Sequence, residues 1–172
     1  GAVLLCGRYE GLDQRIDVAA TFLSWDFRHA LLARFASDAT LSAPARAEEL
    51  TRLRDSAARE HEFFVALVTT EQRYGRLDRP TSAWRVRLLD DRGREVAPAH
   101  IAQVRRPSAA EERYFPFVTP WRQVFRVRFP VRGLNPDGTE FDVLGEGTRS
   151  FVLRFSGALG TADLRWEVAA GG

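Results

Sequence analysis

The chain contains no lysine, no methionine and a single cysteine, Cys6. Without lysine it cannot use a Schiff-base amine or the usual phosphate-binding loop, because both depend on that side chain. One cysteine cannot form a disulfide within the chain or supply a zinc cluster. No run approaches the roughly 20 apolar residues that span a bilayer. These absences exclude several enzyme classes and predict no transmembrane segment.

All 25 basic residues are therefore arginine; they stand against 23 acidic residues, and the net charge is +2. Arginine stays charged at any ordinary pH, and the calculated pI of about 9.2 reflects that property. The acidic residues are interleaved with the arginines, so the sequence contains no patch of one sign. We therefore favour a balanced, solvated surface and expect no nucleic-acid partner.

The second half of the chain alternates apolar and polar residues in short runs, at 84–88, 125–129, 151–155 and 164–168. A period of two predicts strands with one buried and one solvated face. A return strand over 94–104, interrupted by Pro98, is predicted to lie at a sheet edge. The arginines inside these runs are expected to face solvent and keep the protein soluble: Arg85, Arg87, Arg126, Arg128, Arg154 and Arg165.

Helical signals lie almost entirely before residue 60. After a predicted strand over 16–22, Ser24 can begin one helix, and Pro44 can begin a second that runs to about Arg59. A β-forming run over 61–70 follows. Ser108 and Glu111 have the spacing of a capping box for a short helical turn over 109–114.

We therefore predict one domain of the α+β class, mainly β. Residues 61–169 are expected to form an immunoglobulin-like antiparallel β-sandwich of about seven or eight strands. A strand and helices over 16–60 pack on it, and residues 1–15 form a linker or processed N-terminus. The predicted core comprises Phe22, Phe27, Leu31, Phe63, Val65, Leu67, Trp84, Val86, Leu88, Phe125, Val127, Phe129, Phe151, Leu153, Phe155, Leu164 and Trp166.

Candidate catalytic or metal-binding residues are few. His29, His61 and His100 lie on different predicted elements and lack the spacing of metal ligands, so surface or satisfied core positions are favoured. The segment 135–140 carries the acidic residues of a calcium loop, but its Pro and Gly favour an ordinary turn. We predict no catalytic, cofactor-binding or metal site and no cofactor, and we favour a non-enzyme.

The most aromatic stretch is 114–121, which two prolines keep irregular. Tyr114, Phe115, Phe117 and Trp121 could form a partner surface for a peptide or carbohydrate, and this interpretation requires an exposed Trp121. The alternative, which we favour, is a loop folded over the end of the core.

The apolar run Ala2–Leu5 precedes Cys6, and the chain begins without methionine. We expect a processed or truncated N-terminus, with the apolar run as the tail of a removed export signal. Cys6 is then a candidate for lipid attachment, which would anchor the protein without a membrane span. A plain unpaired cysteine is the alternative, because Leu5 stands where a lipoprotein signal carries a small residue.

The string CGRYEGLDQR, residues 6–15, resembles a signature of bacterial tRNA (guanine-N1)-methyltransferases. The resemblance implies a knotted α/β fold, S-adenosylmethionine as cofactor, and a cofactor loop made of Gly7, Arg8, Tyr9, Glu10 and Gly11. The Gly-Asp-Tyr and Ser-Gly-Gly-Glu segments that follow in that family are absent here. We therefore favour chance similarity in a linker, with a methyltransferase fragment as an alternative.

A wider resemblance covers residues 16–168, including SWDFRHALLARFA, EHEFFVALVTT and YFPFVTPWRQVFRVRFP. These runs resemble uncharacterised bacterial proteins made with export signals, often labelled lipoproteins. The resemblance implies a β-sandwich located in the periplasm or at the outer membrane. It predicts a structural or binding role, with an envelope protein or polysaccharide as the kind of partner.

Overall fold

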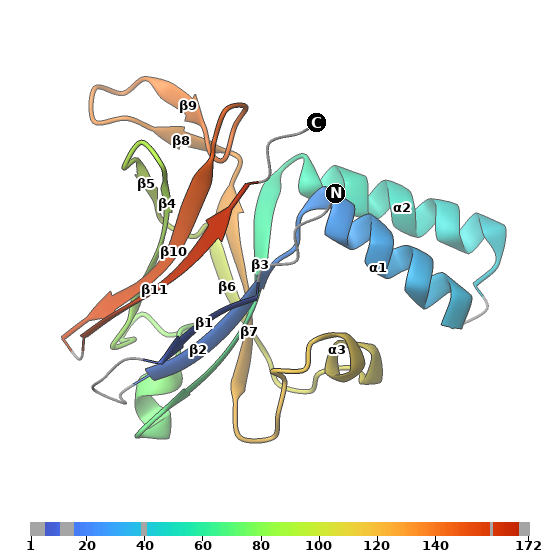
Figure 1. Ribbon diagram of the computed structural model, residues 1–172, viewed down its shortest axis with the longest axis horizontal. Helices are drawn as coiled ribbons and strands as arrows, with labels where there is room; N and C mark the ends of the chain where they lie inside the picture. The colour runs from blue at the N-terminus through green and yellow to red at the C-terminus, as the bar shows by residue number, and fades with distance from the viewer. Residues whose placement is uncertain (1–5, 11–15, 39–40, 159, 169–172) are drawn as a thin grey trace.

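Two antiparallel sheets and a helical hairpin make up the fold, which is mainly β and of the α+β class (Figure 1). The computed structural model describes residues 6–10, 16–38, 41–158 and 160–168. The five-stranded sheet has the order β1 (Cys6–Glu10), β2 (Ile16–Phe22), β3 (Glu60–Thr69), β7 (Gln123–Pro130) and β6 (His100–Val104). The four-stranded sheet has the order β11 (Gly160–Glu167), β10 (Ser150–Gly157), β4 (Arg85–Asp90) and β5 (Glu95–Val96).

Smaller elements connect the sheets. A two-stranded sheet joins β8 (Arg132–Leu134) to β9 (Glu140–Asp142), with a turn between them at 135–138 as predicted. A 3-10 turn, η1 (Gln72–Gly75), follows β3. Helix α3 (Ala109–Tyr114) begins at Ser108, whose hydroxyl and Glu111 form the expected capping box.

The facing sides of the two sheets share one apolar core. On β3 the residues Phe63, Val65 and Leu67 face the other sheet, and the ring of Phe63 lies 5.4 Å from that of Trp166 on β11. The alternation of strands β4, β7, β10 and β11 is confirmed, because their predicted inward residues all belong to this core. Phe22 packs against it while remaining partly exposed.

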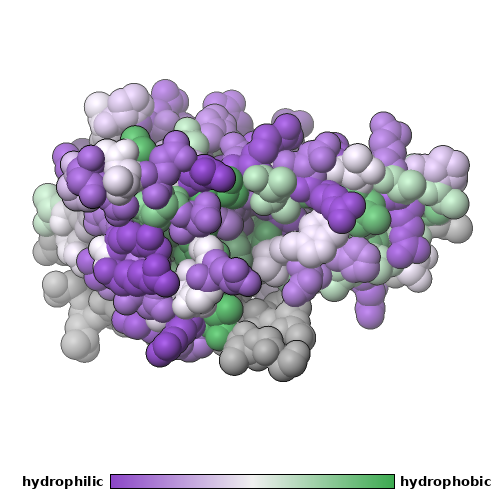
Figure 2. Space-filling view, turned by 90° about the horizontal axis from the view of Figure 1, so that it is seen from above, coloured by the Kyte–Doolittle hydropathy of each residue, from purple (hydrophilic) through white to green (hydrophobic). Residues whose placement is uncertain are grey.

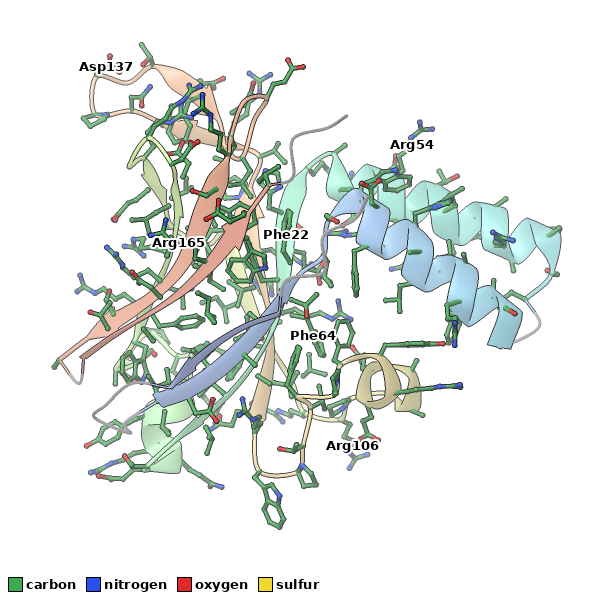
Figure 3. The ribbon with its side chains drawn as sticks, in the orientation of Figure 1. Phe22, Arg54, Phe64, Arg106, Asp137 and Arg165 are labelled. Atoms are coloured by element: carbon green, nitrogen blue, oxygen red, sulfur yellow. The ribbon has the colours of Figure 1, made fainter. Side chains whose placement is uncertain are left out.

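Strand β3 is also buried on its other face. Phe64 and Ala66 point away from the main core and join a second apolar cluster with Phe115. Figure 3 shows Phe22 on the side of β10 and β11, and Phe64 on the side of α3. The predicted core residues Phe27 and Leu31 belong to this second cluster. The five-stranded sheet therefore carries apolar contacts on both faces.

Helices α1 (Trp25–Asp38) and α2 (Ala43–Ala57) form a hairpin that projects from the five-stranded sheet, here called the arm (Figure 1). The predicted start of α2 is confirmed: the Ser42 hydroxyl accepts a hydrogen bond from Ala45 N, and proline stands in the first turn. Helix α2 has no buried residue. From above, hydrophobic residues appear among hydrophilic ones on the arm (Figure 2).

The expectation that residues 1–15 form a linker is wrong for residues 6–10. These residues form strand β1, which pairs antiparallel with β2 in a register that places Cys6 opposite Thr21. The open edge of β2 supplies the hydrogen-bonding partners, so a segment rich in glycine and charge becomes a strand without strong β propensity. The observed antiparallel pairing also differs from the knotted α/β fold implied by the short methyltransferase-like string.

The predicted strand over 94–104 is two strands. Residues Glu95–Val96 form the edge of the four-stranded sheet, and His100–Val104 form an edge of the five-stranded sheet. Pro98 lies between them, where it cannot donate a ladder hydrogen bond. The edge location was therefore predicted correctly, whereas the crossing from one sheet to the other was not.

His61 is half-buried and hydrogen-bonded, and His29 and His100 are exposed. The Nε2 atom of His61 lies 2.6 Å from Val143 O, and since a carbonyl only accepts, Nε2 donates. Within the described segments no cluster of three or more His, Cys, Asp or Glu side chains could hold a metal ion. Burial lowers the pKa of His61 from 6.5, and the nearby charge of Arg28 lowers it further, against the bond to Val143.

This lowered pKa predicts that His61 makes the protein less stable in acid. As the pH falls below about 6.5, the unfolded chain protonates His61 before the folded protein does, so the free energy of unfolding decreases. Urea unfolding between pH 7 and pH 5 should show a steeper loss for the wild type than for His61→Gln. Parallel curves for the two proteins would show that His61 titrates normally in the folded state.

Candidate functional site

A cleft of about 690 Å³ lies between the arm, helix α3 and the outer face of the five-stranded sheet. The arm contributes Leu31, Leu32, Phe35 and Leu53 to its lining, and α3 contributes Tyr114. The arm and α3 lie on the same side of the sheet, at separate places (Figure 1). Because the side chains that they contribute here are leucine, phenylalanine and tyrosine, the walls of the cleft are largely apolar.

The base of the cleft is charged, and its centre is Glu62 on β3. This carboxylate is 4% exposed because it lies on the outer face of a strand that is covered on both sides. Three arginines surround it: Arg28 at 3.6 Å, Arg126 at 2.6 Å and Arg128 at 3.7 Å. A buried carboxylate needs such partners. Moving an unpaired charge from water into the protein costs on the order of several kcal/mol, even after the surrounding protein has relaxed.

Arg28 connects the arm to the sheet. Its side chain is 5% exposed, and its Nε donates to Leu23 O at 2.7 Å while Nη1 donates to Ser56 Oγ at 3.2 Å. The guanidinium thus holds α1, α2 and, through Glu62, β3. Burial lowers the pKa of Arg28, Glu62 opposes that shift, and the charges of Arg126 and Arg128 add to it.

Arg126 connects the sheet to α3. Its Nη1 donates to Glu62 at 2.6 Å and its Nη2 donates to Glu111 at 2.7 Å. The guanidinium carbon also lies 5.3 Å from the centre of the Phe64 ring, within cation–π range. Burial alone would lower the pKa of Arg126, but the bonds to the two carboxylates raise it.

Glu111 is held in its ionised form. Burial favours the neutral acid, but the backbone N–H and hydroxyl of Ser108 and the guanidinium of Arg126 lower the pKa of Glu111 below its ordinary value. The same carboxylate therefore caps α3 and forms an ion pair with Arg126 at the base of the cleft. The capping box recognised in the sequence is one wall of the site.

Arg128 differs from the other two arginines. Its Nε is buried and makes no hydrogen bond, lying 3.7 Å from both Glu60 and Glu62. Its side chain donates no hydrogen bond to any described residue, whereas Arg28 and Arg126 each donate two. Arg128 is thus a positioned guanidinium in the cleft with unused donors.

The aromatic residues of 114–121 divide between two environments. Tyr114 and Phe115 line the cleft, and Phe115 and Phe117 pack with Phe64 in the second apolar cluster. Trp121 lies outside it and is 81% exposed. The structure therefore brings two of the four predicted partner-surface residues, Tyr114 and Phe115, to the cleft; it packs Phe117 against the second apolar cluster and leaves Trp121 in solvent.

Cys6 lies at the beginning of β1, but its side chain is outside the described atoms. Its assignment as a lipidation site therefore stays a prediction.

The expectation that the strand arginines face solvent holds only in part for Arg126 and Arg128, which line the cleft with side chains 34% and 37% exposed. Both point to the outer face of β7 as the alternation requires, but the arm and α3 cover part of that face. Arg28, Glu62 and Glu111 were not recognised as parts of one site. The available signal was Glu62 itself, a single charge between His61 and two phenylalanines in a strand of buried residues.

No protein family, curated protein or solved structure matches this chain. None of the helices within the described segments has the length and apolar character to cross a bilayer. The interpretation of the cleft therefore depends on its own geometry and chemistry.

The burial of Glu62 predicts that Glu62→Gln decreases the free energy of unfolding by about 3–5 kcal/mol, because Arg28 would stay buried without its carboxylate. Urea denaturation measures this change. The double variant Arg28→Met with Glu62→Leu should recover much of the loss, since it removes both charges together.

The control is the cross-strand pair of Arg154 and Asp163, whose side chains are 39% and 37% exposed. Asp163→Asn should change stability by about 1 kcal/mol or less. An equal effect of Asp163→Asn and Glu62→Gln would contradict the special role of the buried pair.

Proposed function

We propose that this is a non-enzymatic binding protein and that the cleft beneath the arm is its ligand site. The observation that carries the proposal is the combination of apolar walls with convergent charged groups at one end. Ligand sites in proteins typically measure about 300–1,000 Å³ and have this distribution of apolar and polar groups. The volume of about 690 Å³ lies in that range.

The chemistry of the charged groups favours binding over catalysis. Arginine does not exchange protons near neutral pH. The carboxylates of Glu62 and Glu111 are paired with arginine, and the pKa of Glu111 lies below its ordinary value. His61 projects from β3 toward the main core, on the opposite face from Glu62. These groups are suited to holding a charge in place and not to moving a proton.

A cell-envelope location belongs to the same proposal and rests on the resemblance to exported bacterial proteins. An acyl anchor on Cys6 would hold the β1 edge of the five-stranded sheet close to a membrane, because the strand begins at that residue. We also propose an immunoglobulin-like sandwich for the two sheets, which is supported by their antiparallel pairing and shared core. This fold hosts many functions and selects none.

Trp121 supports a second candidate function. A peptide- or carbohydrate-binding surface on segment 114–121 requires this side chain to be exposed, and it is 81% exposed. Exposed tryptophans are frequent anchors at interfaces. Because Phe115 and Phe117 are packed away, such a surface would depend on Trp121 and its immediate neighbours.

The cleft predicts binding of a neutral apolar dye such as Nile red, with enhanced and blue-shifted emission. Ala110→Trp places a large ring in the cleft from α3 and should weaken binding by at least tenfold, on the order of the loss expected from steric exclusion. Fluorescence titration of the purified protein measures the affinity.

The matched control is Ala109→Trp, one residue earlier on α3 and exposed outside the cleft lining. It should leave Nile red binding unchanged. Absence of dye binding by the wild type would refute the proposed ligand site. Equal Nile red affinities of Ala110→Trp and Ala109→Trp would show that the dye binds outside the cleft.

The envelope location predicts that the full-length gene product, expressed in a bacterium with its own N-terminus, is cleaved and fractionates with membranes. Its intact mass should show an acyl increment on Cys6. An uncleaved protein in the cytosolic fraction would overturn the location without affecting the cleft.

A further inference from the structure

We propose that the ligand of the cleft is a single-chain amphiphile with a carboxylate head, of the fatty-acid class, and that Arg128 binds its head group. This inference rests on the proposed function, because it names the ligand of the same site. It follows from the charge of the cleft base, the unused donors of Arg128 and the apolar walls beside them.

The charge in the cleft favours an anion. Its lining contains one more guanidinium group than carboxylates, and each carboxylate is already engaged. Glu62 and Glu111 share Arg126, and at the rim Glu49 pairs with Arg52 at 2.5 Å. Glu60 lies outside the lining and 3.7 Å from Arg128 Nε, so what favours an anion is the set of Arg128 N–H groups that have no carboxylate within hydrogen-bonding distance. The low polarity of the walls strengthens their field.

Arg128 is the group that can accept this ligand. Arg28 and Arg126 use their donors on the protein, whereas the side chain of Arg128 donates no hydrogen bond within the described segments. Glu60 and Glu62 lie 3.7 Å from its Nε, so they orient the guanidinium electrostatically without occupying its outer N–H groups. A planar guanidinium with free N–H groups matches a carboxylate in a two-bond arrangement.

The remaining wall of the cleft suits a hydrocarbon chain. Leu31, Phe35 and Leu53 come from the arm and Tyr114 from α3, so the apolar surface lies on both sides of the space beside Arg128. Phe35 is 39% exposed although it is a large hydrophobic residue. Covering such surface with a hydrocarbon chain stabilises the complex, because it removes apolar area from water.

Displacement of Nile red by three ligands with the same twelve-carbon tail tests the inference. Dodecanoate should bind about tenfold more tightly than dodecanol, and dodecyltrimethylammonium should bind most weakly, since only the carboxylate pairs with Arg128. Equal affinities of dodecanoate and dodecanol would refute the carboxylate preference and leave the proposed binding function intact. Failure of all three ligands to displace the bound dye would refute an amphiphile of this size.

Arg128→Met identifies the residue that recognises the head group. This variant should lower the affinity for dodecanoate to that for dodecanol and leave dodecanol binding unchanged. Arg165→Met is the control, because it removes the same charge from an exposed position on β11. An equal loss of dodecanoate affinity in both variants would show that the effect comes from the net charge of the protein. If Arg128→Met loses no affinity for dodecanoate, Arg128 does not bind the head group.

Discussion

The structure depends on the burial of β3 on both faces. One face of this strand supplies Phe63, Val65 and Leu67 to the core between the sheets, and the other supplies Glu62 and Phe64 to the region beneath the arm. A strand in this position must carry apolar residues on both faces or pair any charge it buries. Glu62 is that charge, and its partners come from α1 (Arg28) and from β7 (Arg126 and Arg128).

Pairing of Glu62 determines how the arm is attached. Helix α2 buries no residue, so few apolar contacts hold it in place. Arg28 compensates by bonding to Leu23 O, Ser56 and Glu62, which lie in three different parts of the chain. The arm is thus held to the sheet by the polar contacts of Arg28 together with the apolar contacts of Phe27 and Leu31 on α1, and the cleft lies beneath it.

The same network gives the cleft its chemical character. Arg126 and Glu111 neutralise each other and fix α3 against the sheet, while Arg128 is oriented by Glu60 and Glu62 without a hydrogen bond from its side chain. A charged residue needed for stability and a charged residue available to a ligand therefore lie two positions apart on one strand. Both side chains reach the cleft because residues two apart on a strand point to the same face of the sheet.

The sequence by itself determined the mainly β class, most strand positions and nearly all of the main core, because period-two alternation and turn residues are local properties of the chain. It also determined the start of α2 and the capping box of α3, which depend on side chains three residues apart. Only the tertiary structure decided that β1 pairs with β2, that residues 95–104 cross between sheets, and that Arg28, Glu62, Glu111 and Arg126 converge. Alternation shows that Arg126 and Arg128 share a face of β7, but not what covers that face. That depends on the placement of the arm and α3, which come from distant parts of the sequence.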